Sequence, residues 1–439
     1  MKSTMRRIRW NERPHLAAIV SNFGWLLADK ALRMAGGILL SVWLARYLGT
    51  TGFGVYNYAI AFVALFTPIA SLGMNEVVVR DLVAEADSAP GILGTAAGLT
   101  LASGLMALAA CTLAFRMFGA GGPGTGVLVA LFGMTLLLRF SDVVKYWYQS
   151  LTASRMTIWI EGTVFIIFFA IKSLLIAFHA PLSAFILALV GEALATSVGL
   201  LLLYALQNGG LGRWSFHSNR ARVLIGDSAP IVLSGGLVLL CMNLDKVMLG
   251  RMSGVGEVGL FSAATRLTEA WYFLPVIIGA SIYPRLTRLH ALDSSAYRNA
   301  AQQAFNLLFF SALAVCFLAW IFSGPVIRLL YGAAYAPAAK MLMVHVWTSL
   351  FVFHVSLRTQ LLIIERNRRL ILAFSSLTLA ANFAINLYAI PKAGGIGACY
   401  SSLVSWALCA LIFPLMFRKS RRFPMQFFPF PIDVRKNVY

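Results

Sequence analysis

The sequence predicts an all-α integral membrane protein with about twelve transmembrane helices in two pseudosymmetric six-helix lobes around a central cavity. Three observations support this fold class. Hydrophobic residues make up 59% of the 439 residues and charged residues only 12%, with a mean hydropathy of +0.79, which does not fit a water-soluble domain. About twelve apolar stretches are each long enough to cross a bilayer. In addition, a glycine-rich segment of the first half recurs in the second half.

The apolar stretches divide six and six about a polar linker. We expect a basic N-terminal segment over 1–19, an N-lobe over 20–206, a cytoplasmic linker over 207–222, a C-lobe over 223–417 and a basic, aromatic tail over 418–439. The predicted helix cores are 20–46, 54–75, 92–116, 127–149, 156–178 and 182–206, then 224–250, 257–283, 302–323, 339–363, 370–390 and 395–417. The first apolar stretch is too long for a signal peptide, so we expect an uncleaved first helix.

The repeated segment joins two helices through a bend. Leu44–Gly73 returns about 205 residues later as Leu249–Gly279, with matching glycines and a proline in the second helix of each copy. Such duplicated halves are how many transporters are built, and glycine and proline permit bending. The candidate hinge residues are Gly49, Gly54, Pro68, Gly254, Gly259 and Pro275.

The net charge of +20 is explained by topology. With the N-terminus inside, cytoplasmic segments hold about 23 of the 36 Lys and Arg residues, as the positive-inside rule requires. Both termini are therefore expected to face the cytoplasm, and the basic surface to attract anionic membrane lipids. This interpretation is favoured over nucleic-acid binding, so no nucleic-acid partner is expected.

Ionisable side chains inside the predicted spans are the candidate functional residues, because they cost several kcal/mol each and normally face a bundle interior or a watery cavity. One interpretation is local ion pairing that holds helices in register. The pairs would be Asp29–Arg33, Arg139–Asp142 and Arg266–Glu269. Lys145 extends the threefold spacing of Arg139 and Asp142, and Lys172 is expected to snorkel to the headgroups.

The other interpretation is a cavity with a cationic bias between the halves. Arginine suits an anionic headgroup because its planar fork binds phosphate oxygens bidentately and stays charged when buried. The candidate anion contacts are Lys30, Arg33, Arg139, Arg266 and Arg358, and the candidate acids for ion or proton coupling are Asp29, Asp245 and Glu269.

Enzymatic and metal chemistry find no support in the sequence. The five cysteines lie in apolar stretches without paired spacing, which predicts neither disulfide nor metal site. His345 and His354 are either proton relays or, more often in apolar helices, hydrogen-bonded structural residues. No catalytic triad, P-loop or nucleotide fingerprint occurs, so we expect no catalytic residue and no cofactor.

Four stretches carry a family resemblance. LARYLGTTGFGVYNYAIAFVALF and LDKVMLGRMSGVGEVGLFSAATRLTEAWYFLPVIIGASIYPRL resemble polysaccharide-biosynthesis flippases of the multidrug/oligosaccharidyl-lipid/polysaccharide exporter superfamily. The same family is resembled by two later stretches, Tyr331–Trp347 and Asn382–Ser405, so the resemblance extends over about 20–417. It implies two lobes that alternate between inward- and outward-open forms in a bacterial plasma membrane. The implied cargo is a polyprenyl-diphosphate-linked glycan destined for O-antigen, capsule or exopolysaccharide, with a polysaccharide polymerase or export complex as a further partner.

Two other functions are also compatible with the sequence. A drug or metabolite antiporter of the same superfamily would keep the fold but is expected to have a net acidic cavity. A membrane-embedded polymerase or glycosyltransferase would need a substantial external loop, whereas no predicted external turn exceeds roughly 20 residues. Dye uptake would favour the antiporter, and newly formed glycosidic bonds would favour the polymerase.

Overall fold

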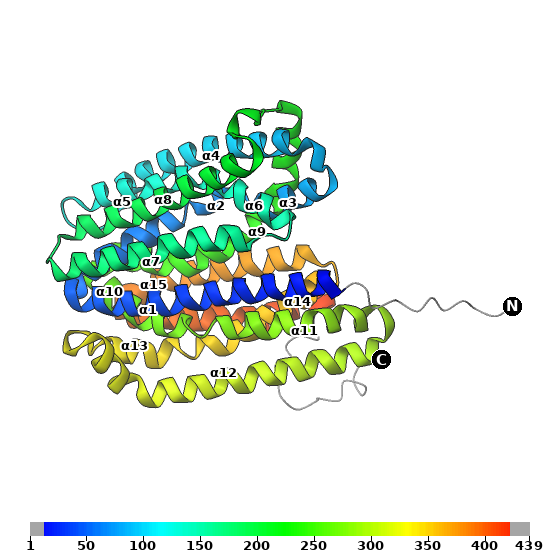
Figure 1. Cartoon of the computed structure of the whole chain (residues 1–439). Coiled ribbons are helices and arrows are strands. Elements are labelled where there is room, and N and C mark those ends of the chain that lie inside the picture. The colour runs from blue at the N-terminus through cyan, green and yellow to red at the C-terminus, as the bar shows by residue number, and fades with distance from the viewer. Residues whose placement is uncertain (1–12, 422–439) are drawn as a thin grey trace.

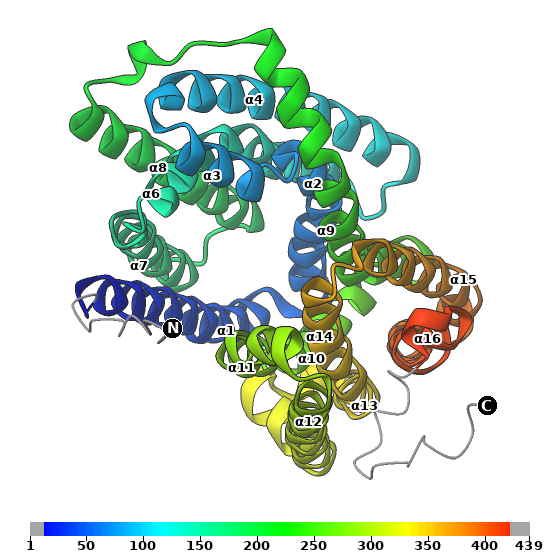
Figure 2. The same ribbon diagram turned by 90° about the vertical axis from the view of Figure 1, so that its right-hand side faces the viewer.

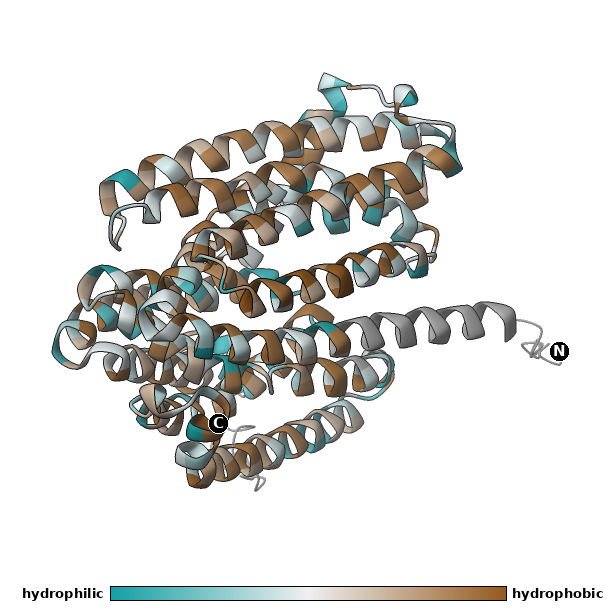
Figure 3. Ribbon diagram, turned by 60° about the vertical axis from the view of Figure 1, so that its left-hand side comes forward, coloured by the Kyte–Doolittle hydropathy of each residue, from teal (hydrophilic) through white to brown (hydrophobic). Residues whose placement is uncertain are grey.

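The computed structural model describes the backbone of residues 13–421 and the side chains of residues 32–421, apart from residues 231, 234, 280 and 419. The side chains of Asp29 and Lys30, most of the basic N-terminal segment and residues 422–439 of the tail therefore lie outside the described part. Within it, all regular elements are helices, which confirms the predicted fold class. Hydrophobic residues dominate along these helices (Figure 3), and many large ones, such as Leu105 and Leu174, are exposed, as expected of surfaces that face lipid.

The described part of the first half of the chain contains eight α-helices. They are α1 (Arg13–Ala64), α2 (Thr67–Ser71), α3 (Asn75–Ala84), α4 (Ala89–Phe118), α5 (Thr125–Gly133), α6 (Asp142–Ser150), α7 (Arg155–Ala177) and α8 (Leu182–Asn208). Short 3₁₀ helices lie at η1 (Ala86–Ser88), η2 (Met134–Ser141) and η3 (Leu211–Arg213).

The second half, as far as residue 421, also contains eight α-helices. They are α9 (Ser218–Met252), α10 (Val255–Glu269), α11 (Phe273–Leu292), α12 (Ser294–Tyr331), α13 (Ala338–His345), α14 (Thr348–Ile364), α15 (Arg368–Ala407) and α16 (Phe413–Met416). Short elements are η4 (Ala333–Tyr335), the π-helical turn η5 (Leu408–Ile412) and η6 (Arg418–Ser420).

These helices account for the predicted spans. Eight helical segments of the described chain are long and apolar enough to cross a membrane, and α9, bent by 56° between Pro230 and Gly235, makes a ninth. The segments that contain α1 and α15 each provide two spans. Each of these helices is interrupted by a glycine with a positive φ, Gly49 in α1 (φ 66°) and Gly394 in α15 (φ 54°). With α10 and α11 as another broken span, the architecture agrees with the about twelve spans expected from the hydropathy pattern.

The helices form two lobes. Viewed along the bundle in Figure 2, α2–α8 lie on one side and α10–α16 on the other, with α1 and α9 along the boundary. The start of α1 and the final helix α16 lie at the same end of the bundle (Figure 1), which we call the terminal end. The opposite end, where α5, α10 and α13 lie, we call the distal end.

Helices α10–α16 share a hydrophobic core with the N-lobe only towards the distal end. There one cluster of buried side chains combines residues of both halves, such as Phe53 and Phe185 with Phe261 and Tyr335. Towards the terminal end the core divides into two clusters. One lies around α3, α4, α6 and α8, and the other around α11, α12, α14 and α15. Apart from the start of α9, whose Leu224 packs in the first of these two clusters, the lobes are therefore joined at the distal end and separate at the terminal end.

The repeated bends lie at the centre of the distal junction. Gly49 breaks α1, and Gly254, with φ 94°, directly precedes α10. Gly54 and Gly259 lie one turn further on, inside regular helix, where α1 and α10 cross. A Cβ on Gly54 would overlap the carbonyl oxygen of Val255, and a Cβ on Gly259 would overlap that of Thr50. The two copies thus contact each other reciprocally through positions related by the same shift of about 205 residues.

The prolines of the repeat follow a second pair of breaks. In the first copy, α1 ends at Ala64 and α2 begins at Thr67, next to Pro68. In the second copy, α10 ends at Glu269 and α11 begins at Phe273, close to Pro275. The fold therefore has breaks at Gly49, at Gly254 and beside both prolines, while Gly54 and Gly259 serve close packing. Motion about any of these six residues stays a prediction.

Candidate functional site

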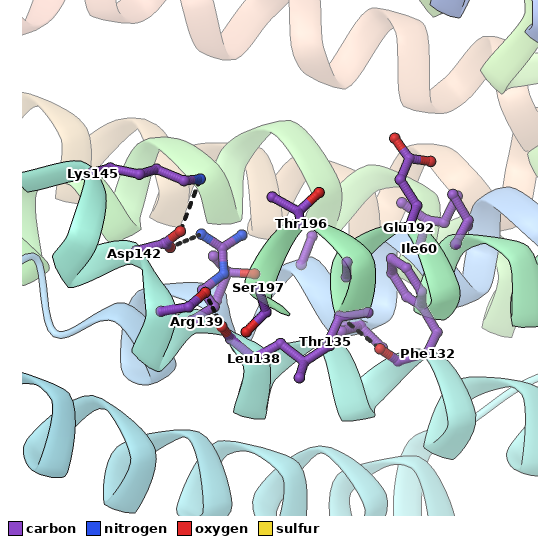
Figure 4. A pocket seen from close by; sticks show the side chains of 16 residues that line it. Ile60, Phe132, Thr135, Leu138, Arg139, Asp142, Lys145, Glu192, Thr196 and Ser197 are labelled. Carbon is purple, nitrogen blue, oxygen red and sulfur yellow. Dashed lines mark hydrogen bonds and ion pairs between the residues drawn. The ribbon is translucent and has the colours of Figure 1, made fainter. Parts of the chain in front are cut away.

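A polar cavity of about 460 Å³ lies inside the N-lobe, between α1, η2, α6 and α8. Arg139, Asp142 and Lys145 gather at one end of it, and Glu192 lies at the other (Figure 4). Thr135, Thr196 and Ser197 lie between these charges (Figure 4), and Thr67 and Ser141 add two further hydroxyl groups to the lining. Ile60, Val63, Phe132, Leu138 and Leu189 supply its apolar wall. The cavity is therefore amphipathic and carries both signs of charge.

The 3₁₀ helix η2 explains how one span presents so many polar groups to this cavity. It continues α5 for eight residues and leads directly into α6. A 3₁₀ helix has three residues per turn, so side chains three apart align in one row. Thr135, Leu138 and Ser141 follow this spacing and all line the cavity, as do Arg139 and Asp142.

The charged side chains at this end form a continuous ion-pair chain. Arg139 Nη1 lies 3.7 Å from Asp142 Oδ2, which confirms the predicted local pair, and Lys145 Nζ lies 2.9 Å from Asp142 Oδ1. Lys145 also contacts Glu161 of α7 at 2.5 Å, and Glu161 lies 3.7 Å from Arg33 Nη2 of α1. The chain therefore connects the cavity to the lobe boundary at α1.

At the other end, Glu192 is held by a buried cation. Lys172 Nζ of α7 lies 2.5 Å from Glu192 Oε2, and only 6% of the Lys172 side chain is exposed. The expectation that Lys172 snorkels to the headgroups is wrong, because an acid on the neighbouring helix satisfies its charge inside the lobe. Glu192 thus has a fixed position along the cavity wall.

Arg33 lies on α1, and Arg266 of α10 approaches α1 one turn further along the helix, at Gly37. The guanidinium of Arg33 lies 5.5 Å from the centre of the Phe165 ring, and its side chain is 32% exposed. Arg266 is exposed on α10, and its Nη2 atom would lie 2.9 Å from a Cβ placed on Gly37 of α1. Glu269 lies 3.7 Å from Lys246 in the described structure, rather than in the predicted pair with Arg266.

Arg358 lies apart from these cations, inside the C-lobe. It is 1% exposed, donates to the carbonyl oxygen of Cys409 at 2.5 Å and lies 4.5 Å from the centre of the Phe374 ring. Its surroundings contain a separate cavity of only about 70 Å³. A substrate contact at Arg358 would need the C-lobe interior to open.

Asp245 is buried among polar side chains of the C-lobe. Its Oδ1 atom accepts hydrogen bonds from the amide groups of Asn382 at 2.9 Å and Asn386 at 2.6 Å, and its Oδ2 atom accepts one from the Ser402 hydroxyl. Only 4% of Asp245 is exposed. All three hydrogen-bond donors are neutral groups, so none of them compensates the negative charge of the carboxylate.

Sequence reasoning did not select several residues of these sites. Glu161, Glu192, Asn382 and Ser402 gain their roles from neighbours on other helices. Asn382 and Asn386 carried a usable signal, because two amides one helical turn apart in an apolar helix share a face. In the described structure, no group of three or more His, Cys, Asp or Glu side chains could hold a metal ion.

Comparisons with known proteins agree with this architecture. The family model for polysaccharide biosynthesis proteins matches residues 19–290. A Shigella flexneri protein named "Putative O-antigen transporter" is 21% identical over 334 residues, which cover 72% of this chain and 78% of that protein. These two matches rest on sequence alone.

Solved structures extend the similarity to nearly the whole fold. The lipid II flippase MurJ, in an inward closed conformation, has a TM-score of 0.73 at 14% identity, covering 89% of this chain and 86% of MurJ. An inward-facing multidrug resistance MATE family transporter of the MOP superfamily has a TM-score of 0.69 at 13% identity, covering 86% and 91%. The chain thus belongs to the polysaccharide biosynthesis protein family, is a multi-pass membrane protein, and shares its fold with the MurJ flippase and with this MATE family transporter.

Proposed function

We propose that this protein is a flippase that moves a polyprenyl-diphosphate-linked oligosaccharide from the cytoplasmic to the external leaflet of a bacterial plasma membrane. The glycan would serve O-antigen, capsule or exopolysaccharide synthesis, and the protein would form no glycosidic bond itself. A polysaccharide polymerase or export complex is the expected recipient. The family and the O-antigen transporter relative support this cargo class.

The observation that carries the proposal is the position of the cations relative to the lobe junction. Helices α10–α16 share a hydrophobic core with the N-lobe only towards the distal end. Arg33 belongs to the boundary helix α1, one turn from Gly37, which Arg266 of α10 approaches from the C-lobe. We place the terminal end in the cytoplasm, as the distribution of basic residues predicts, so the separated ends of the lobes would open inward. A diphosphate entering from the cytoplasm would meet both guanidinium groups.

Alternating access would then follow from rocking of the lobes. In the outward-open form the junction at Gly54 and Gly259 would part and the terminal ends would meet. The two arginines would stay near the bilayer midplane, and access to them would switch from the cytoplasmic to the external side. Arg139, at the edge of the N-lobe cavity, remains a third candidate contact. Lys30 lies outside the described side chains and stays a sequence prediction.

Arg33→Ala, Arg266→Ala and Arg139→Ala test the cationic site. We expect each of the first two to slow transfer of a polyprenyl-diphosphate glycan about 10- to 100-fold, since a hydrogen bond to a charged group contributes about 1.5–3 kcal/mol. Arg→Lys should restore the rate only partly, because lysine cannot bind two oxygens with a planar fork. The measurement is leaflet exchange of the glycan in vesicles containing the purified variants.

The exposed Arg116 on α4 provides the matched control, and Arg116→Ala should retain the wild-type rate. Wild-type transfer by Arg33→Ala, Arg139→Ala and Arg266→Ala alike would contradict a cationic substrate site.

We further propose that Asp245 couples transport to a proton or a cation, with Asp29 and Glu269 as the remaining candidates. A buried carboxylate whose partners are neutral can change its charge state or bind a small cation without breaking an ion pair. Asp245→Asn should fold but lose the acceleration that an imposed proton or sodium gradient gives to the wild type. Asp87→Asn, at an exposed position, should keep that acceleration. An undiminished gradient response in Asp245→Asn would exclude Asp245 from coupling.

A further inference from the structure

The N-lobe cavity between η2 and α8 has properties that a diphosphate site does not need. Arg139 and Lys145 already share Asp142, and Lys145 also contacts Glu161. Among the lining residues, two cations face the two carboxylates of Asp142 and Glu192, so their formal charges cancel. A further dianion would have to compete with carboxylates already in place. Beyond Arg139 at its edge, the cavity is therefore poorly suited to phosphate.

Its lining suits a polyhydroxylated ligand instead. A sugar ring offers hydroxyl donors and acceptors around its edge and apolar C–H groups on its faces. Carboxylates and threonine or serine oxygens can accept from sugar hydroxyls, and ammonium and guanidinium groups can donate to them. Thr135 donates its own proton to the carbonyl oxygen of Phe132 at 2.7 Å, which leaves its oxygen free to accept. The Phe132 side chain and its aliphatic neighbours provide the apolar surface.

We propose that this cavity is a saccharide subsite for uncharged or zwitterionic sugar residues of the lipid-linked glycan. The inference rests on the proposed flippase function and adds to it a site that selects the glycan. Its volume of about 460 Å³ lies within the range typical of small-molecule sites, about 300–1,000 Å³. The charged groups at both ends are held in place by ion pairs, which pre-organises their contacts with a sugar. Lys145 pairs with Glu161 at one end, and Glu192 pairs with Lys172 at the other.

The ion-pair chain connects the proposed diphosphate contacts to the subsite and so indicates how the cargo would be oriented. Arg33 contacts Glu161, and Glu161 contacts Lys145 at one end of the subsite. A diphosphate held by Arg33 and Arg266 would thus leave the attached glycan next to Lys145, from which it extends along Thr135 and Thr196 towards Glu192. The headgroup and the glycan are recognised by different parts of the N-lobe and its boundary.

The test uses two carriers in the same vesicles. One is the polyprenyl-diphosphate glycan extracted from cells that make this protein, and the other is the same extract trimmed by glycosidases to its first sugar. The double variant Thr135→Val/Thr196→Val removes two hydroxyls with little change in shape and leaves every ion pair intact. At subsaturating carrier density we expect it to slow transfer of the intact glycan about tenfold, as two lost hydrogen bonds require, and to slow the trimmed carrier much less.

The control is Thr112→Val on α4, a similarly half-buried threonine whose hydroxyl bonds a carbonyl oxygen one turn back, outside the cavity. It should transfer both carriers at wild-type rates. Equal slowing of both carriers by the double variant, or slowing of neither, would overturn the saccharide subsite. Wild-type protein that moves neither carrier would overturn the flippase function itself, and the subsite with it.

Discussion

Gly54→Ala should open the distal junction between the lobes. The new methyl group would overlap the Val255 carbonyl oxygen, a backbone atom that cannot rotate away, so the crossing helices must move apart. Overpacking of this kind costs about 1–3 kcal/mol and here penalises only the state in which the junction is closed. Hydrogen exchange of backbone amides in 50–62 and 255–268 should therefore accelerate by about tenfold or more.

Gly259→Ala should have the same effect, because its methyl group would overlap the Thr50 carbonyl oxygen. Gly256→Ala is the matched control on the same helix, since its Cβ would lie 3.7 Å from Thr51 Oγ1, an ordinary contact. Unchanged exchange in both Gly54→Ala and Gly259→Ala would show that the crossing is not close-packed as described.

Lys172→Ala should destabilise the N-lobe by about 3–5 kcal/mol, because it leaves the Glu192 carboxylate without its buried partner. Thermal unfolding of the purified protein, followed by tryptophan fluorescence, measures the loss. Removing both charges in Lys172→Met/Glu192→Gln should recover much of the stability, since no uncompensated ion then remains.

An exposed ion pair provides the contrast. Arg80 and Asp227 lie 2.6 Å apart, but their side chains are 57% and 41% exposed, so Arg80→Ala should cost less than about 1 kcal/mol. If Lys172→Ala were as mild as Arg80→Ala, the buried pair would have no structural role.

The repeat was the most informative part of the sequence for the fold. The matching glycines at a fixed shift indicated two related halves, and the structure places breaks at Gly49 and Gly254 in equivalent positions. The role of Gly54 and Gly259 was not predictable in the same way. A hinge glycine and a crossing glycine look alike in sequence, and only the contact between α1 and α10 shows which atoms would collide.

For the charged residues, local spacing predicted local partners and nothing more. The threefold spacing of Arg139 and Asp142 correctly indicated an ion pair. Glu161 and Lys172 pair instead with residues on other helices, and helix packing rather than sequence distance decides such contacts. Arg358 illustrates the same limit, because its apolar helix gave no sign that Cys409 and Phe374 would enclose it.

The most direct test of the flippase function is the leaflet location of lipid-linked glycan in cells that lack this protein and any redundant flippase. We predict accumulation of the polyprenyl-diphosphate glycan on the cytoplasmic face, relieved by re-expression of the wild-type chain but not of Arg33→Ala or Arg266→Ala. Normal delivery of the glycan to the external leaflet without the protein would contradict the account and direct attention to a drug or metabolite cargo.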